Sequence, residues 1–318
     1  MASSSTPKRA KGAVDAAAAI TQSLSQRADQ ALKIRGMIFR SLLLLSMTIA
    51  LIAIVAIISW ALVEGGQRLS WGLLTNNPSS FRPETAGYRP AILGSLQIIA
   101  GVIFLIIPLG VGAALYLEQF ANKERWYNRV IELNIQNLAG VPSIVFGILG
   151  LAFIVRGPLD LGFVAAAGSM TIALLVLPTV ILSSREAIKA VPSSLLEGAM
   201  ALGVTRWQAV WKMVLPAAAP GMLTGVILAV ARAIGEAAPL LLVGASTFVT
   251  FDPNFWQDGY SALPVMIYQY AGRPQDEFKV LAAAGVIVML GIVVVVNSVA
   301  VWLRARYERS WQGAKHER

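Results

Sequence analysis

The segment Pro192–Pro216, PSSLLEGAMALGVTRWQAVWKMVLP, is a polar interruption between two apolar runs, and the organisation of the chain follows from it. Ser194-x-x-Glu197 and Thr205-x-x-Gln208 each have the spacing of a capping box, which predicts a helix start. Gly203 lies between them and is the residue type most often found just past a helix end. A proline cannot continue the helical hydrogen-bond ladder, so Pro216 is expected to end or bend the second helix. The segment is therefore predicted to form a compact helix–turn–helix.

The second of these helices is predicted to carry an apolar stripe. Trp207, Val210, Trp211 and Val214 fall at i, i+3, i+4 and i+7, which places them on one helix face. Such a face packs against another part of the chain or against a partner. The alternative interpretation is a linker between two membrane helices that happens to be helical.

The composition predicts an all-α integral membrane protein. Of 318 residues, 56% are hydrophobic and only 14% are charged, against about 25% charged in a typical soluble domain. Six apolar runs have the length of roughly 20 residues that a helix needs to cross a bilayer. These predicted transmembrane helices are residues 41–63, 91–117, 138–155, 162–182, 221–244 and 280–303.

Several kinds of chemistry are absent from the sequence. The chain has no cysteine, and its one histidine, His316, lies in a charged tail. Thiolate chemistry and histidine-based catalysis within the fold are therefore excluded. No G-x-x-x-x-G-K-[ST] loop occurs, so any ATP used by the system must be hydrolysed by another chain.

Lysine and arginine are unevenly distributed between alternate loops. Of 26 such residues, 19 fall in residues 1–40, 118–137, 183–220 and 304–318, and six fall in the three loops between them. The positive-inside rule therefore predicts that both termini and the Pro192–Pro216 segment are cytosolic. The net charge of +9 then follows from the topology, and no nucleic-acid partner is expected.

These patterns predict five parts of the chain. They are a flexible basic cytosolic tail at 1–40 with at most a short helix near 16–32, a first transmembrane helix at 41–63, an extracytoplasmic loop at 64–90, a core of five transmembrane helices at 91–303 with the helix–turn–helix at 192–216, and a basic cytosolic tail at 304–318.

The stretch Arg232-Ala-Ile-Gly-Glu236 places two charges inside the fifth apolar run, which we expect to hold them near the middle of the span. Residues four apart share a helix face, so the two side chains can compensate each other. Pro239 removes a hydrogen bond to the carbonyl of Gly235 and should loosen the helix there. Intramembrane charges often mark a substrate path, and a guanidinium matches an oxyanion such as phosphate. A buried ion pair that only fixes packing is the alternative.

The spacing Glu197-Gly198-Ala199-x-x-x-Gly203, followed after nine residues by Met213-x-Leu215-Pro216, resembles the EAA loop of binding-protein-dependent ABC importer permeases. Gly198 and Met213 stand where the family form has alanine and isoleucine. The resemblance implies a type I importer architecture with six transmembrane helices. It also implies that a separate ATPase is coupled through Glu197, Gly198, Ala199, Gly203, Arg206, Leu215 and Pro216.

The stretch from Arg232 to Pro239, together with Leu263-Pro264 before the last span, resembles the PstA-type permeases of bacterial phosphate importers over residues 85–305. This resemblance implies a substrate path with Arg232 and Glu236, beside a helix break at Gly235 and Pro239. It further implies a bacterial inner-membrane location and three partners: a PstC-like sister permease, a dimer of PstB-like ATPase subunits and an extracytoplasmic PstS-like phosphate-binding protein. This chain would bind no cofactor and catalyse no reaction, because the partner ATPase uses the ATP.

Four alternatives remain open at this level. The chain could be the PstC-like sister permease, or a permease for another oxyanion or a phosphonate. A stand-alone secondary transporter or channel would need no ATPase, although the inverted repeat usual for that class is not evident. A membrane scaffold for phosphate sensing is compatible with any of these.

Overall fold

The computed structural model describes residues 7–122, 124–245 and 248–316, and within them the regular elements are helices. The chain divides into two units, one up to Trp60 and one from Ala61 onward. The expectation of an all-helical protein is thereby confirmed.

The first unit consists of helix α1, Pro7–Gly66, which runs on into the second unit. Its part from Arg35 to Gly66 is long and apolar enough to cross a membrane. The prediction of at most a short helix near 16–32 in the tail at 1–40 is wrong, because α1 already begins at Pro7 and continues into the span. No proline follows Pro7 before the span, and the intervening residues are rich in alanine and other strong helix formers. Nothing in the sequence therefore separates this stretch from the helix after it.

The second unit contains the remaining helices, four of which are π-helical segments labelled η. In chain order they are α2 (Trp71–Thr75), α3 (Arg89–Ile106), η1 (Ile107–Val111), α4 (Gly112–Leu115), η2 (Tyr116–Phe120), α5 (Trp126–Ala139), α6 (Ser143–Leu149), η3 (Gly150–Val155), α7 (Ala165–Lys189), α8 (Ser193–Ala201), α9 (Arg206–Ala209), η4 (Val210–Val214), α10 (Leu215–Gly235), α11 (Ala238–Leu242), α12 (Leu263–Ala271) and α13 (Asp276–His316).

The membrane spans differ from the expected six in one place. Five helices within the described residues are long and apolar enough to cross, and a sixth span exists only if α5 and α6–η3 are counted together. These two are bent by 112° at the loop between them. The span predicted at 138–155 is therefore not one continuous helix, because Pro142 cannot continue α5 and instead precedes the first residue of α6.

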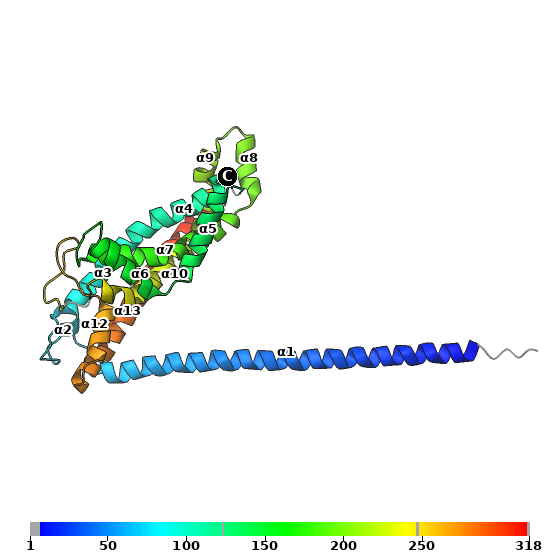
Figure 1. The fold of residues 1–318 in the computed structure, drawn as a ribbon, viewed down its shortest axis with the longest axis horizontal. Coiled ribbons are helices and arrows are strands. Elements are labelled where there is room, and N and C mark those ends of the chain that lie inside the picture. The colour runs from blue at the N-terminus through cyan, green and yellow to red at the C-terminus, as the bar shows by residue number, and fades with distance from the viewer. Residues whose placement is uncertain (1–6, 123, 246–247, 317–318) are drawn as a thin grey trace, which may run out of the picture. The chain divides into compact units, whose positions relative to one another are not determined.

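Helix α7 is the centre of the second unit. It packs against α3 on one side and α10 on another, while α13 packs against α10 and α12 (Figure 1). Its first turns, Ala165–Ser169, carry only small side chains and are buried. Small residues allow close helix approach, which is the main way helices associate where water supplies no driving force.

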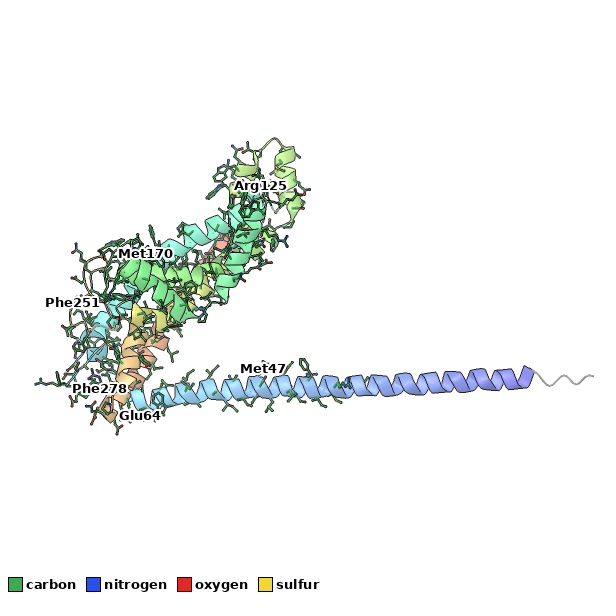
Figure 2. The ribbon with its side chains drawn as sticks, in the orientation of Figure 1. Met47, Glu64, Arg125, Met170, Phe251 and Phe278 are labelled. Atoms are coloured by element: carbon green, nitrogen blue, oxygen red, sulfur yellow. The ribbon has the colours of Figure 1, made fainter. Side chains whose placement is uncertain are left out.

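The second unit has two distinct ends. Figure 1 shows α8, α9 and the C-terminus at one end, and α2 and α12 at the other. Figure 2 shows Arg125 near the first end, and Phe251 and Phe278 near the second. The helices α3–η2, α7, α10 and α13 run between these ends, so the helix–turn–helix at 192–216 and the C-terminus share one end of the unit.

Candidate functional site

The helix–turn–helix expected at 192–216 is present as α8 and α9. Thr205 is the N-cap of α9: its Oγ1 accepts from the Gln208 backbone N–H at 3.4 Å, and its own N–H donates to Gln208 Oε1 at 3.3 Å. The second predicted capping box is thus confirmed. The first is wrong, because α8 begins at Ser193 with Pro192 in the cap position, two residues before the predicted cap at Ser194. Ser194 lies inside the helix and cannot cap it.

The turn between α8 and α9 depends on Gly203. The Gly203 N–H donates to Met200 and the Val204 N–H to Ala199, at 3.0 and 3.3 Å, which is the Schellman pattern. Gly203 has φ +83°, in the left-handed region that glycine adopts without a steric penalty. The expected role of Gly203 past the end of the first helix is confirmed.

Pro216 does not end the helix as expected. The helix continues from Arg206 to Gly235, and the five residues of η4 immediately before Leu215 form a wider π turn. Proline in a regular α-helix would clash with the carbonyl four residues earlier, and a π turn relieves such local strain. Val214 and Ala218, on either side of Pro216, are both buried in one apolar cluster, so tertiary packing keeps the helix continuous.

The predicted apolar stripe is only half buried. Val210 and Val214 are buried in the cluster with Leu115 and Ile188, which joins α4, α7 and the start of α10. Trp207 and Trp211 are 59% and 48% exposed. Their rings lie 5.4 Å apart, and Trp207 also contacts Phe120 of η2 at 5.7 Å. The stripe therefore has a buried part that fixes the segment and an outer part that is available for contact.

The residues expected to couple to an ATPase are brought together at this end of the unit. Glu197, Gly198, Gly203 and Arg206 are exposed, Leu215 and Pro216 are partly buried, and Ala199 is buried. Large apolar side chains are exposed beside them, among them Leu202 at 86%. We refer to α8, α9 and η4 as the coupling segment. Its surface combines charges with exposed apolar side chains, as a protein-binding surface does.

Arg232 and Glu236 contact each other. Arg232 Nε lies 3.3 Å from Glu236 Oε1, with side chains 45% and 17% exposed. The apolar run predicted at 221–244 is not one helix, because α10 begins earlier, at Leu215, and ends at Gly235. Arg232 is in the last turn of α10, and Glu236 follows with extended backbone, φ −78° and ψ 115°. A cation in the last turn also interacts favourably with the helix dipole.

The helix break expected beside these charges is present. Helix α10 ends at Gly235, and after two residues the chain resumes as α11, which has Pro239 in its first turn. Helix α11 packs against α6, where Gly147 faces Pro239 directly: a Cβ on Gly147 would lie 2.7 Å from Pro239 Cα. The break is therefore held in place by a close contact with another helix.

An ion cluster that the sequence analysis missed lies behind the coupling segment. Arg185 of α7 is 4% exposed, and it donates to Glu118 and to Glu132, each at 2.7 Å. The sequence contained one indication. Ile181, Ser184, Arg185 and Ile188 have the i, i+3, i+4, i+7 spacing of one helix face, and all four are buried. The acidic partners are 67 and 53 residues away, so no local pattern could identify them.

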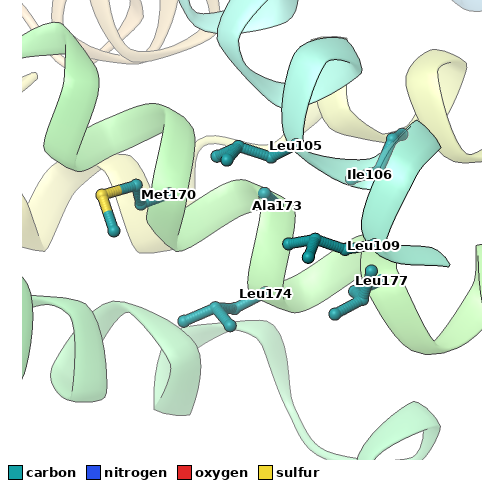
Figure 3. A pocket seen from close by; sticks show the side chains of 7 residues that line it. All are labelled: Leu105, Ile106, Leu109, Met170, Ala173, Leu174 and Leu177. Carbon is teal, nitrogen blue, oxygen red and sulfur yellow. The ribbon is translucent and has the colours of Figure 1, made fainter. Parts of the chain in front are cut away.

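A hollow of about 110 Å³ lies between α3–η1 and α7. Figure 3 shows its lining, which is entirely apolar: Leu105, Ile106, Leu109, Met170, Ala173, Leu174 and Leu177. It offers an anion no polar group. Within the part of the chain that the structure describes, no three Asp, Glu, His or Cys side chains gather as a metal ion would require.

The fold and this site define a multi-span helical membrane protein with a polar helix–turn–helix at one end and a charged helix break within a span. The chain belongs to the family described as the binding-protein-dependent transport system inner membrane component, whose pattern matches residues 106–309. By that description, members of this family are membrane components of transport systems.

Relatives and solved structures agree with this assignment. The chain is 34% identical to the phosphate transport system permease protein PstA of Mycobacterium leprae, over 72% of this chain and 75% of that protein. It is 35% identical to PstA of Yersinia pestis, over 69% and 73%. The fold is shared with a bacterial alginate ABC transporter crystallised with a substrate-bound periplasmic protein, at a TM-score of 0.59 and 13% identity, covering 84% of this chain and 93% of the other.

Proposed function

We propose that this chain is the PstA-type permease subunit of an ATP-driven importer of inorganic phosphate. The observation that carries the proposal is the 34–35% identity to two phosphate permeases over about 70% of the chain. An Arg–Glu pair at a helix break inside an apolar span supports it, because a guanidinium binds a phosphate oxygen through directed, charge-assisted hydrogen bonds.

The proposed topology puts the coupling segment and both termini in the cytosol, at the inner membrane of a bacterium. The support is the distribution of Lys and Arg, 19 of which fall in the segments assigned to the inside. The proposed partners are a PstC-like sister permease that completes the path, two PstB-like ATPase subunits and an extracytoplasmic PstS-like phosphate-binding protein. ATP would be bound and hydrolysed by the ATPase pair alone.

The proposed mechanism uses α9, η4 and α10 as one lever. Because the helix is unbroken from Arg206 to Gly235, its 30 residues extend about 45 Å from the coupling segment to the helix break. Closure of the ATPase pair on ATP would displace Trp207 and the exposed side chains around it. The displacement would reach Arg232 through the helix, and the path would open to the binding protein.

At the other end of this lever, Arg232 would receive the anion. Its side chain is half-exposed, so it can reach a substrate without leaving its own helix. Glu236 holds the guanidinium in place between transport cycles and competes with the incoming phosphate for it. Binding is therefore strong enough to admit the ion and weak enough to release it. ATP hydrolysis would return the lever and close the path.

The test is uptake by proteoliposomes that contain this chain, its co-purified permease and ATPase, and the binding protein. We expect ATP-dependent uptake of radiolabelled phosphate that sulfate and phosphonates do not compete for. Glu197→Lys, which reverses an exposed charge of the coupling segment, should abolish uptake while the chain still inserts. Arg82→Gln, in the loop before α3, is the control and should leave uptake unchanged.

Three outcomes would contradict the proposal. Competition by another oxyanion would change the substrate, and uptake without the ATPase would make the chain a secondary transporter or channel. Co-purification with a second PstA-type permease, instead of a PstC-like one, would assign this chain the sister role.

A further inference from the structure

Arg185 joins three separate segments of the second unit. It lies on α7, and its guanidinium donates through Nε to Glu118 of η2 and through Nη2 to Glu132 of α5, both at 2.7 Å. The side chains of Arg185 and Glu118 are 5% and 3% exposed, while that of Glu132 is 40% exposed. Lys189, one turn later on α7, lies 3.9 Å from Glu118 at the rim of the cluster.

The geometry of this cluster depends on arginine. Two nitrogens of one planar guanidinium donate to two carboxylates on different elements. The three segments, η2, α5 and α7, are therefore held at fixed relative angles. A lysine is a single point charge and cannot set both directions at once. A buried ion pair often adds little net stability over apolar packing. The presence of this buried ion cluster therefore favours a role in specifying the geometry of the three segments.

The cluster lies directly behind the coupling segment. Phe120, two residues after Glu118, contacts Trp207 of α9 with ring centroids 5.7 Å apart. Leu115, the last residue of α4 before η2 begins, and Ile188 of α7 are buried with Val210 of η4 in one apolar cluster. Helix α7 also leads after three residues into α8. A displacement of the coupling segment is therefore transmitted to η2 through the contact between Trp207 and Phe120. It is transmitted to α7 through the apolar cluster and through the three residues that connect α7 to α8.

We propose that Arg185 is a positioning residue for energy coupling, which makes the ends of η2, α5 and α7 move as one body when the coupling segment is displaced. Without this connection, movement of α8 and α9 would be absorbed by local rearrangement of η2, a π-helical segment of the kind that often occurs at functional sites. The inference rests on the proposed function only in requiring that an ATPase drives this chain.

The test compares ATP hydrolysis with uptake in the reconstituted complete transporter. In Arg185→Gln we expect basal ATP hydrolysis within about twofold of the unchanged protein. Stimulation by the loaded binding protein should be lost, and uptake should fall about tenfold, as expected for a coupling energy of ordinary size. Arg185→Lys keeps the positive charge but loses the planar guanidinium that donates to both carboxylates. It should give an intermediate ratio of ATP hydrolysed to phosphate imported. Lys189→Gln, at the exposed rim, is the matched control and should behave like the unchanged protein.

Two results would overturn the proposal. One is normal uptake with normal stimulation in Arg185→Gln. The other is a parallel loss of assembly, hydrolysis and uptake in Arg185→Gln and Arg185→Lys alike, which is the signature of a role in folding only. If Arg185→Gln does not fold, Glu132→Gln is tested instead, because it weakens only the half-exposed ion pair between Arg185 and Glu132. An unchanged ratio of ATP hydrolysed to phosphate imported in Glu132→Gln would also overturn the proposal.

Failure of the phosphate assignment can be distinguished from failure of this inference. If the unchanged complex transports a different anion, the ratio of ATP hydrolysed to that anion imported still tests Arg185. If the unchanged complex transports phosphate and the ratio does not respond to Arg185→Gln, the assignment stands and the inference fails.

Discussion

Gly147 of α6 and Pro239 of α11 are in direct backbone contact: a Cβ on Gly147 would lie 2.7 Å from Pro239 Cα and 3.1 Å from its carbonyl oxygen. This contact fixes α11 next to the end of α10, where Arg232 and Glu236 lie. A side chain at Gly147 can be accommodated only if α6 or α11 shifts, since the obstructing atoms belong to the backbone. The orientation of the charged helix break thus depends on an absent side chain in another helix.

Gly147→Ala should therefore impair transport. Overpacking of this kind typically costs about 1–3 kcal/mol, and here it would also displace the helix break. We expect a lower thermal unfolding temperature of the purified complex and reduced phosphate uptake.

Gly291→Ala is the matched control for this prediction. Gly291 lies inside α13, away from the helix break, and its Cβ would meet nothing within 4 Å, so stability and uptake should be nearly unchanged. Equal effects of the two substitutions would show that the contact between α6 and α11 is unimportant.

Arg232→Gln should reduce uptake by about tenfold or more, the effect of losing a charge-assisted hydrogen bond worth ~1.5–3 kcal/mol. Because Arg232 is half-exposed and pairs only with Glu236 one turn away, the pair contributes about 1 kcal/mol or less to stability, and assembly should be unaffected. Arg232→Lys should retain part of the activity with a raised KM for phosphate. Normal uptake in Arg232→Gln would show that Arg232 does not bind the substrate and only interacts with the C-terminal end of α10.

Gly203→Ala should weaken the coupling segment. Alanine in the left-handed conformation that Gly203 adopts costs roughly 1–2 kcal/mol, and the turn between α8 and α9 would open or rearrange. We expect lower recovery of the ATPase when the chain is purified from membranes. Gly198→Ala is the control: its Cβ meets nothing within 4 Å and lies inside α8, so it should preserve or slightly stabilise the helix. A Gly203→Ala chain that recovers the ATPase in full would contradict the assigned role of this turn.

The features predicted correctly from sequence are those decided by neighbours along the chain. The Thr205 cap, the Gly203 turn and the break at Pro239 each depend on side chains within a few residues. The prediction of a cap at Ser194 is wrong for an equally local reason. Pro192, with φ −57° and ψ 131°, already occupies the cap position, so the helix begins earlier in the chain, at Ser193.

The features that were wrong or missed depend on contacts between distant segments. A proline rule applied to Pro216 alone predicts a break, but burial of Val214 and Ala218 in one cluster keeps the helix continuous. Arg185 reads in sequence as one more positive charge at the inner side, because its carboxylate partners come from other elements. Family resemblance indicated the coupling segment and the Arg–Glu pair, yet it gave no sign of the ion cluster around Arg185.

Three buried tyrosines should make the second unit sensitive to alkali. Burial raises the pKa of Tyr88 and of Tyr260 well above the usual value, and it raises the pKa of Tyr270 to about 12. Tyr88 and Tyr260 also donate to the carbonyls of Leu281 and Val243, at 3.0 and 3.1 Å. The folded protein therefore favours the neutral phenols, whereas the unfolded chain ionises them near pH 10. Their contribution to stability is complete below about pH 10 and is lost as the pH rises toward 12 and above.

The measurement is thermal unfolding of the purified complex from pH 7 to 12, followed together with phenolate absorbance. Tyr270→Phe removes a phenol that burial keeps neutral in the folded protein, so the stability of this variant should decline less steeply above pH 10. Tyr268→Phe, at a 65% exposed position of the same helix, is the control and should not change the slope. Ionisation of all seven tyrosines near pH 10 in the folded complex would contradict the burial of these three, and with it the packing of α12 against α13 that encloses Tyr270.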